Sequence, residues 1–302
     1  MHKKPTVIII AGPTASGKTA LAIELALHFD TEILSADSRQ CFKELNIGVA
    51  KPALEELAQA HHYFINSHSI HESVNAGIYE KYALESLDKI FAKKNIAIVV
   101  GGTGLYIKAL CEGVDEMPVI SASTRNSIIK NYEGMGLGWL QNEVQTKDPL
   151  FWQNAEQQNP QRLMRALEIV EETTKSITEF QSGKKVARSF NIIKVALEWQ
   201  REHLYDRINR RTGLMIEQGL ENEVRQLLAH RSLNALQTVG YSEMFDYFDH
   251  KISLKEAIEK IKTNTRHYAK RQMTWFKKDK DFHWFDPSEK ENILSFIKSA
   301  IG

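Results

Sequence analysis

Residues 12–19 carry the phosphate-loop pattern Gly-x-x-x-x-Gly-Lys-Thr, and few patterns restrict a fold so strongly. An apolar, β-branched segment at residues 6–11 precedes the loop, and an amphipathic segment from Lys18 follows it. Strand, glycine-rich turn and helix in this order bring backbone N–H groups and a helix N-terminus to one phosphate. The alternative, a chance match in a turn, is disfavoured by this context. The predicted phosphate-binding residues are Gly12, Pro13, Thr14, Ala15, Ser16, Gly17, Lys18 and Thr19.

Two side chains of this loop carry chemistry. Lys18 supplies a full positive charge to a bound phosphate, and Thr19 offers its hydroxyl to Mg²⁺. We therefore expect Mg²⁺ as a cofactor, with Thr19 as its contact. The loop alone does not name a reaction, because ATPases, kinases and diphosphate-using transferases share it.

The first third of the chain alternates strand and helix patterns, which is typical of a parallel α/β sheet. The fold predicted is a P-loop NTPase-like core, a parallel sheet flanked by helices. Ligands of such sheets lie at the carboxyl ends of the strands, so we expect residues 12–19, 37–40 and 101–104 around one crevice. The expected elements are strands at 6–11, 31–36 and 96–100 and helices from Lys18 and over 78–93.

After Gly113 the sequence becomes more polar, and its residue pattern is typical of helices. We interpret residues 115–190 as an inserted helical module. Residues 1–114 would form the first part of the core, and residues 191–302 would complete it with basic helices. Expected elements there are a strand at 191–198 and long helices at 204–230 and 254–278.

Composition excludes several classes of protein. A hydrophobic content of 42% over 302 residues suits a large buried core. No apolar run approaches the roughly 20 residues of a membrane span. The two cysteines, Cys41 and Cys111, form no Cys-x-x-Cys pair, so neither a disulfide framework nor a cysteine zinc site is expected. We expect a cytoplasmic protein without a membrane partner, and a monomer because no large apolar stripe is evident.

Charge is distributed unevenly although the net charge is only +1. Residues 260–280 contain eight lysines and arginines against a single acid, Asp279, which gives this segment a charge of +7. A polyanion would bind such a segment, with Lys270 and Arg271 as contacts. The alternative interpretation is a solvated helix face.

An acid follows the second expected strand, in the segment "SADSRQ". The strand at residues 96–100, where a P-loop ATPase usually carries its acid, ends instead in Gly-Gly-Thr. Asp37 is therefore predicted to face the phosphate loop, as a partner of the Mg²⁺ shell or as a base for an attacking group. An N-cap aspartate in an ordinary turn is the alternative.

Two further segments have candidate ligand contacts. The glycines of residues 101–104 permit close approach of a ligand that Thr103 can hydrogen-bond, although helix packing also needs small residues. A helix is expected from Asn159, as N-cap, and Pro160. Gln161 and Arg162 at its start can contact bases or phosphates, unless this face is only solvated. Its expected apolar stripe is Leu163, Met164, Leu167 and Val170, and its expected polar face is Gln161, Arg162, Arg165 and Glu168.

Seven segments occur together in one order: "GPTASGKT", "ADSRQCFKELNIGVAKP", "HHYFIN", "GGTGLYIKAL", "NPQRLMRALEI", "VGYSEM" and "TRHYAKRQMTWFKK". This ordered set resembles the tRNA dimethylallyltransferases over most of residues 6–285. The carboxyl-terminal zinc finger of some eukaryotic members is missing, so the resemblance is to the bacterial type. Phe42, Val49 and Asn159 depart from the tyrosine, threonine and aspartate common in the family.

The resemblance implies a reaction. A dimethylallyl group would pass from dimethylallyl diphosphate to the N6 amine of the adenosine 3′-adjacent to the tRNA anticodon, and diphosphate would leave. The partners implied are dimethylallyl diphosphate and the anticodon stem-loop of tRNA. The loop, which holds ATP or another nucleotide in many proteins, would then hold an isoprenoid diphosphate with Mg²⁺.

The resemblance also implies roles for single residues. Asp37 would take or orient the amine proton, and Lys18 and Thr19 would hold the diphosphate with Mg²⁺. Arg207 and Arg211 would neutralise the leaving group, and Thr103 would contact the substrate. The expected tRNA-contacting positions are Asp37, Ser38, Arg39, Gln40, Thr103, Arg125, Gln161, Arg162, Leu163, Met164 and Arg165, joined by Lys270 and Arg271 of the basic segment.

Three other functions stay open at this stage. An adenylate isopentenyltransferase would use the same donor with a free nucleotide, but it needs neither the inserted module nor the basic segment. A small-molecule P-loop kinase is disfavoured by the ordered motifs. A nucleotide-switched RNA-binding protein without catalysis is disfavoured by Asp37 facing the phosphate loop.

Overall fold

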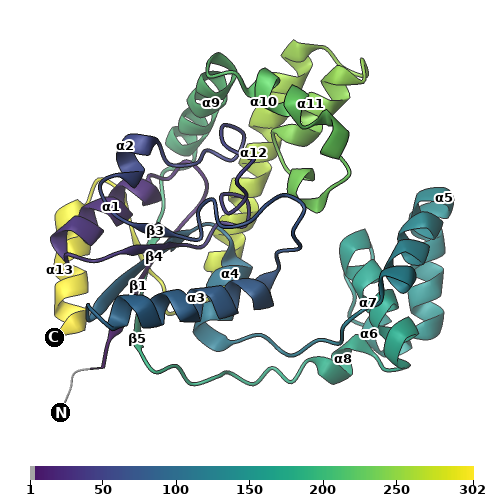
Figure 1. Cartoon of the computed structure of the whole chain (residues 1–302), viewed down its shortest axis with the longest axis horizontal. Helices are drawn as coiled ribbons and strands as arrows, with labels where there is room; N and C mark the ends of the chain where they lie inside the picture. The colour runs from purple at the N-terminus through teal and green to yellow at the C-terminus, as the bar shows by residue number, and fades with distance from the viewer. Residues whose placement is uncertain (1–3) are drawn as a thin grey trace. The chain divides into compact units, whose positions relative to one another are not determined.

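A computed structural model describes residues 4–302, which divide into two compact units (Figure 1). The first unit joins the residues up to Gly113 to Ala187–Gly302, and the second is Val114–Val186. The expected insertion, 115–190, extends slightly too far. Phe190 packs in the core of the first unit, and Arg188 donates from Nε to the Leu110 carbonyl at 2.7 Å. These contacts anchor the last residues of the expected insertion in the core.

The first unit is built on a six-stranded parallel sheet with strand order β3-β2-β4-β1-β5-β6. The central strand β1 pairs on its two sides with β4 and β5, and Ile8 lies opposite Ile98 and Ile193. The predicted parallel α/β core is therefore confirmed. The strands are β1 Thr6–Ala11, β2 Ile33–Ser35, β3 His62–Tyr63, β4 Ile96–Gly101, β5 Asn191–Leu197 and β6 His283–Phe285.

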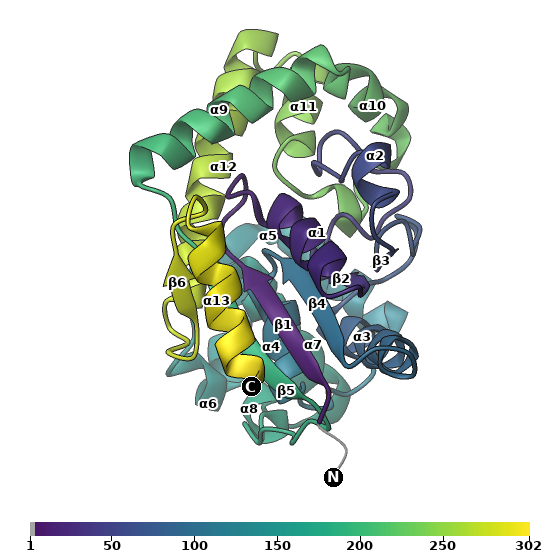
Figure 2. The ribbon, with the colours of Figure 1, turned by 90° about the vertical axis from the view of Figure 1, so that its left-hand side faces the viewer.

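Both faces of the sheet are covered, because alternate residues of its strands point to opposite sides. Ile8 and Ile10 pack in one core with residues of helices α1 (Lys18–His28) and α13 (Lys290–Ile301). Figure 2 shows these two helices on the same side of the sheet. Val7 and Ile9 pack in the other core, with residues of the helices α3 (Ala76–Phe91), α4 (Gly104–Glu112), α10 (Leu220–Gln226), α11 (Tyr241–Phe248) and α12 (Leu254–Phe276). Most residues of these strands are buried and apolar, with Thr6, Ser35 and Lys194 as buried polar exceptions, and the parallel strands end together at one edge.

The remaining helices of the first unit include one correction. The single helix expected over 204–230 is wrong, because the chain breaks after α9 at Gly219, which has a φ of 98°. A glycine adopts this left-handed conformation without the Cβ clash that other residues meet, so the chain turns there. These elements are α2 Leu54–Leu57, α3 Ala76–Phe91, α4 Gly104–Glu112, α9 Arg201–Glu217, α10 Leu220–Gln226, η1 Leu228–His230, η2 Asn234–Leu236, α11 Tyr241–Phe248 and α12 Leu254–Phe276.

The second unit is helical and has a core of its own. Asp148, almost fully buried, accepts from the backbone N–H of Phe151 at 3.0 Å and of Ile177 at 3.2 Å, so one carboxylate joins the starts of two short helices. The predicted cap of α7 is present, since the Asn159 side chain accepts from the Arg162 N–H. The helices are α5 Ala122–Lys147, α6 Pro149–Trp152, α7 Pro160–Thr173 and α8 Ile177–Phe180.

Helix α5 is interrupted by a kink at Gly136, which has a φ of 76° and a ψ of −170°. Across residues 4–302, none of the helices combines the length and the apolar character that crossing a bilayer requires.

Candidate active site

A cavity of about 470 Å³ lies where the phosphate loop, the turn after β2 and the turn after β4 meet. This is the edge at which the strands of the parallel sheet end, the expected place for a ligand. Helices α9 and α12 complete the wall. The lining side chains that carry charge or hydrogen-bonding groups include Thr14, Ser16, Lys18, Thr19, Asp37, Gln40, Glu56, Arg207, Arg210, Arg211, Tyr268 and Gln272.

The phosphate loop is curled by backbone conformations that favour glycine. Gly12 has a φ of 143°, and a Cβ there would lie 2.8 Å from the Leu197 carbonyl oxygen of β5. The Lys18 ammonium donates to the Pro13 carbonyl at 2.5 Å. The fully buried Ser16 hydroxyl has no hydrogen-bond partner among the described residues. Buried hydroxyls are normally satisfied, so this atom indicates a place for a ligand oxygen.

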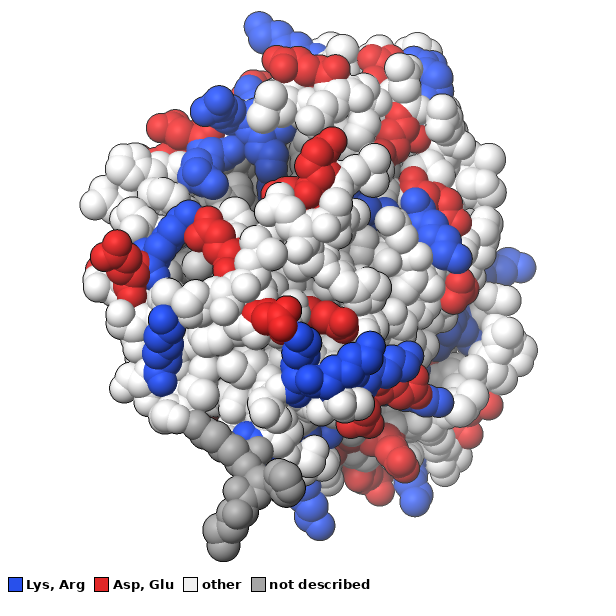
Figure 3. Space-filling view, turned by 60° about the vertical axis from the view of Figure 1, so that its left-hand side comes forward, with Lys and Arg blue, Asp and Glu red and all other residues white. Residues whose placement is uncertain are grey.

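Helix α9 brings arginines to the same loop. Arg207 donates from Nε to the Ala15 carbonyl at 2.7 Å, and Arg211 hydrogen-bonds the Thr14 hydroxyl. The Arg207 guanidinium lies 5.0 Å from the centre of the Trp199 ring, whose N–H donates to the Ser16 carbonyl at 3.0 Å. Figure 3 shows basic side chains gathered around a hollow where α9 runs. The sequence resemblance implied Arg207 and Arg211, and the structure brings both to the phosphate loop.

Closely spaced positive side chains line the cavity, so it suits an anion. Removal from water and the neighbouring Arg211 lower the pKa of Lys18 to about 7, while Asp37 acts in the opposite direction. Removal from water lowers the pKa of Arg211 to about 10, against the attraction of Asp37. Crowded cations of this kind are stabilised by a ligand of opposite charge. The arrangement therefore favours a ligand with several negative charges, such as a diphosphate.

Asp37 combines both interpretations that the sequence left open. Its Oδ1 accepts from the backbone N–H of Arg39 at 2.9 Å and of Gln40 at 3.3 Å, which is an ordinary Asx turn. The same side chain is half-buried in the wall of the cavity that Lys18 lines. The turn fixes the carboxylate through one oxygen, so its direction toward the cavity does not depend on a ligand.

The residues that follow Asp37 form a turn that is held by hydrogen bonds to other segments of the chain. The Ser38 N–H donates to the Thr103 hydroxyl at 3.0 Å, which links this turn to the one after β4. Arg39 donates from its guanidinium to the Asn234 carbonyl at 2.9 Å, and Gln40 donates from its amide to the Ala50 carbonyl at 2.9 Å. Gln40 and Ala50 line the cavity, whereas Ser38, Arg39 and Thr103 are not part of its lining.

Gln272 on α12 is a site residue that sequence reasoning missed. Its amide oxygen accepts from the Thr14 N–H at 2.8 Å, and its amide nitrogen donates to the Gly102 carbonyl at 2.8 Å. A Cβ on Gly102 would lie 2.2 Å from this nitrogen, so the close approach of α12 requires a glycine here. A buried polar residue on the same helix face as Ala269 and Phe276 was the available signal.

Gly104 likewise allows α12 to pack closely against the turn after β4. A Cβ there would lie 2.1 Å from the ring of Trp275. The amphipathic pattern of this helix predicts burial of Tyr268, Met273, Trp275 and Phe276. Trp275 is instead 39% exposed, while Phe276 is buried as predicted. Gln272 occupies the central buried position of this face and leaves Trp275 at its edge. Tyr268 and Met273 are half-buried.

Glu223 on α10 is a second residue that sequence reasoning missed, and it holds the loop that contains residues 47–50. The Glu223 carboxylate accepts from the N–H groups of Ile47 at 2.7 Å and Gly48 at 3.0 Å, and from the Tyr241 hydroxyl at 2.5 Å. A Cβ on Gly48 would lie 2.5 Å from the Tyr241 ring. The next two residues of this loop, 49 and 50, line the cavity. Glu223 and Tyr241 therefore hold one wall of the site from outside.

The residues predicted to contact tRNA in the second unit form a separate group. Gln161 and Arg162 are exposed at the start of α7, and Arg125 is exposed near the start of α5. Leu163, however, has 0% exposure and lies in the core of the unit, so its side chain cannot contact RNA in this structure. Met164 is partly buried against the same core. Glu168 was expected on the solvated face and is buried instead.

The donor set of the cavity suits Mg²⁺ only in company with a ligand. Thr19 and Asp37, a hydroxyl and a carboxylate, line the same cavity. Within residues 4–302 no group of three or more histidine, cysteine, aspartate or glutamate side chains is arranged to hold a metal. Mg²⁺ commonly takes one or two protein oxygens together with substrate phosphates and water, so these residues fit a metal that arrives with a diphosphate.

Fold and cavity together define the class of the protein: a phosphate-loop α/β protein with a basic, partly enclosed anion site beside one carboxylate. The family model for IPP transferase matches residues 40–279. The chain therefore belongs to the IPP transferase family, as the ordered motifs predicted.

Individual relatives agree with this assignment. A tRNA dimethylallyltransferase of Christiangramia forsetii is 48% identical, with 98% of each chain covered. The solved tRNA isopentenylpyrophosphate transferase from Bacillus halodurans is 32% identical, with a TM-score of 0.73 and coverage of 99% of this chain and 97% of that one. A eukaryotic dimethylallyltransferase acting on tRNA is 27% identical, with a TM-score of 0.74 and coverage of 93% and 74%.

Proposed function

We propose that this chain transfers the dimethylallyl group of dimethylallyl diphosphate to the N6 amine of the adenosine 3′-adjacent to a tRNA anticodon. One observation carries the proposal: a fixed carboxylate, Asp37, lines the same cavity as a phosphate loop crowded with cations. An amine acceptor needs the carboxylate, and a diphosphate leaving group needs the cations. The bond from C1 of the donor to the diphosphate oxygen breaks, a bond from C1 to N6 forms, and Asp37 receives the amine proton.

Stabilisation of the leaving group supplies most of the catalysis in this proposal. An adenine amine is a weak nucleophile, because its lone pair is delocalised into the ring. Lys18, Arg207 and Arg211 converge on the phosphate loop and neutralise the charge that grows on the departing diphosphate. Thr19 and Asp37 would hold Mg²⁺ together with the diphosphate, and the metal would supply further charge neutralisation.

The acceptor adenosine reaches the cavity as an extruded base. Extruding a stacked base costs a few kcal/mol and requires a pocket that receives it. Gln40 on the Asp37 turn and Tyr268 on α12 line the cavity and offer polar and aromatic contacts for a base. The N–H of Ser38 and the Thr103 hydroxyl are already bonded to each other, so this pair keeps the turn in place during extrusion.

The basic segment of α12 is proposed as a surface for the RNA backbone. Lys270 and Arg271 are exposed, and neither has an acidic partner among residues 4–302. With Trp275 and Lys278 they line a shallow depression of about 230 Å³. Unpaired cations beside an exposed aromatic ring are suited to a nucleic-acid backbone. By contrast, Lys277 is paired with Glu198 at 2.7 Å.

Charge reversal at this surface tests the proposal. We expect the double variant Lys270→Glu and Arg271→Glu to raise the KM for tRNA strongly while sparing the KM for the donor. Each lost phosphate contact should flatten the log–log salt dependence of binding by roughly 0.7–0.9. Titration of tRNA binding at several salt concentrations measures this slope.

A matched control uses two exposed lysines, Lys89 on α3 and Lys93 in the turn after it, in the variant Lys89→Glu and Lys93→Glu. These residues precede β4 and lie at the end of the sheet opposite the cavity. Circular dichroism and melting report the folding of both variants. A folded Lys270/Arg271 variant with the tRNA affinity and salt slope of the control would make the segment a solvated face.

Donor binding should depend on pH through Lys18. Its pKa in the free protein is about 7, and a bound diphosphate will raise it. Above pH 7 the free lysine loses its proton, so binding must take one up and affinity falls by up to about tenfold per pH unit. Titration calorimetry in buffers of different ionisation enthalpy counts that proton. A Lys18→Met variant should lose the dependence, and equal pH profiles in both proteins would contradict the assignment.

The proposal includes the site of action and the oligomeric state of the protein. We propose a cytoplasmic site of action, since Cys41 and Cys111 are both free thiols. We also propose a monomer. A turnover assay with labelled donor, comparing tRNA, AMP and ATP as second substrates, separates the proposed reaction from an adenylate isopentenyltransferase, from a kinase and from a non-catalytic RNA-binding protein.

A further inference from the structure

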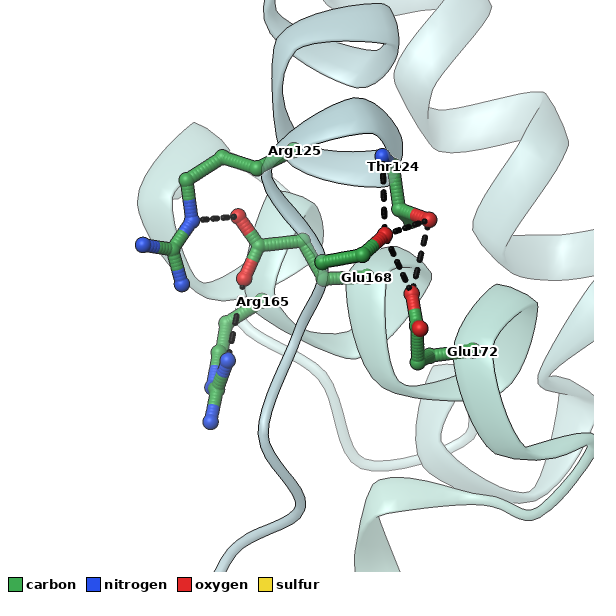
Figure 4. Close-up of polar contacts among 6 residues, drawn as sticks. Thr124, Arg125, Arg165, Glu168 and Glu172 are labelled. Carbon is green, nitrogen blue, oxygen red and sulfur yellow. Dashed lines mark hydrogen bonds and ion pairs between the residues drawn. The ribbon is translucent and has the colours of Figure 1, made fainter.

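Glu168 lies buried between two arginines of the second unit (Figure 4). Its Oε1 accepts from Nε of Arg125, on α5, at 3.2 Å, and its Oε2 accepts from Nη1 of Arg165, on α7, at 3.0 Å. The carboxylate side chain is 10% exposed, whereas the side chains of Arg125 and Arg165 are 47% and 34% exposed. One acid thus joins arginines that are 40 residues apart in the sequence and keeps both at the surface.

The backbone that carries Arg125 is braced separately. Thr124, directly before it, donates from its hydroxyl to Glu172 Oε2 at 2.7 Å, and Ser121 donates to the same oxygen at 3.0 Å. The Ser121 hydroxyl also accepts from the Thr124 N–H at 3.2 Å as the cap of α5. Figure 4 shows this bonding beside the arginine pair, one turn further along α7. The start of α5 is therefore fixed against α7 before any ligand binds.

Glu168 is shared by two arginines. One carboxylate suffices to pair one guanidinium, so Glu168 and its two arginines together keep one positive charge, while the neighbouring Glu172 contacts the hydroxyls of Ser121 and Thr124 and neither arginine. The hydrogen bonds to Glu168 use Nε of Arg125 and Nη1 of Arg165, and both guanidinium forks have further N–H donors. Guanidinium forks match the oxygens of phosphate in geometry and charge. Two forks held side by side by a buried acid are suited to one phosphate group.

We propose that Glu168 is a positioning residue that holds Arg125 and Arg165 as a preformed pair for one backbone phosphate of the RNA substrate. The inference rests on the proposed function, which makes a tRNA the partner. Each arginine alone is an expected tRNA contact from the sequence, whereas Glu168 was expected to be merely solvated. The nearby exposed pair of Arg162 with Glu156, at 3.4 Å, has no buried acid and is not expected to be fixed in this way.

The direction in which Glu168→Gln changes the affinity for tRNA distinguishes a positioning role from a purely electrostatic one. Replacing an acid near an RNA-binding surface removes a repulsive charge, so electrostatics alone predicts tighter tRNA binding. The positioning role predicts the opposite for Glu168→Gln. A glutamine has one oxygen and one NH₂ group, so it can accept from one arginine only and turns a donor toward the other.

The experiment uses the full chain with Glu168→Gln and the matched control Glu172→Gln. Glu172 is an exposed acid on the same helix and contacts hydroxyls, which the oxygen of a glutamine still accepts. For Glu168→Gln we expect tRNA binding about tenfold weaker, a salt slope reduced by roughly 0.7–0.9, and an unchanged donor KM and kcat at saturating tRNA. For Glu172→Gln we expect binding equal to or slightly tighter than that of the unaltered protein.

Two further measurements keep the inference testable. The double variant Arg125→Gln and Arg165→Gln leaves the buried acid in place and should reproduce the slope change, even if Glu168→Gln folds poorly. Glu168→Gln combined with Arg125→Gln should be less than additive, because the residues act as a unit. Equal or tighter tRNA binding by folded Glu168→Gln would overturn the inference, as would additivity. If the unaltered protein fails to modify tRNA, the proposed function fails instead.

Discussion

Replacing Asp37 with alanine is expected to lower kcat by about 10²–10⁴ and to leave donor affinity nearly unchanged, the range for removal of a positioned base. The loss falls on the attacking amine, because the cations that hold the diphosphate are separate side chains of the phosphate loop and α9. Steady-state kinetics with tRNA, together with direct titration of the donor, measures both quantities.

The structure supplies the control for this variant. Asp37 also closes a turn, since its Oδ1 accepts from the N–H groups of Arg39 and Gln40. Asp37→Asn keeps this acceptor and removes the base, so the turn survives and turnover should still be lost. Asparagine that restores turnover would reduce Asp37 to a turn residue, and alanine within a few-fold of the unaltered protein would remove it from the mechanism.

Replacing Lys18 with alanine is expected to weaken donor binding and to lower kcat together. Lys18 contacts charge that is present in the bound diphosphate and grows as the bond breaks, so both the ground state and the transition state lose stabilisation. Loss of one such donor typically lowers kcat by about 10²–10³. Single-turnover kinetics at saturating donor separates the two effects.

A second cavity cation provides the comparison for Lys18. Arg210→Ala removes a charge from the same cavity wall, but this arginine has no hydrogen bond to the phosphate loop among the described residues. Its effect should be smaller than that of Lys18→Ala. Unchanged donor affinity and rate in Lys18→Ala would mean that the loop serves another ligand, and the kinase interpretation would regain support.

The parts of the site formed by neighbouring residues could be predicted from the sequence. The strand and glycine turn that present Lys18 and Thr19 are encoded within about twenty residues, where steric rules and hydrophobic period decide the conformation. The position of Asp37 followed from its place after β2, since parallel strands end at one edge. Both inferences use local patterns and one general rule of topology.

Contacts between distant segments could not be predicted in this way. Gln272 bonds the Thr14 N–H across 258 residues, and Glu223 reaches Ile47 across 176. Nothing in the local sequence around either residue indicates which backbone groups it will meet. The packing that buries Glu168 and leaves Trp275 exposed is likewise decided by neighbouring elements, because helical period alone indicates which face is apolar and not how deeply each residue is buried.

The most direct test is mass analysis of tRNA nucleosides after incubation of the protein with unmodified tRNA, dimethylallyl diphosphate and Mg²⁺. The account predicts one new nucleoside, an adenosine carrying a dimethylallyl group in place of one N6 hydrogen. It should map to the position 3′-adjacent to the anticodon, and the Asp37→Asn variant should not produce it. Unchanged nucleosides from tRNA, together with prenylated AMP or a phosphorylated product in parallel reactions, would contradict the account.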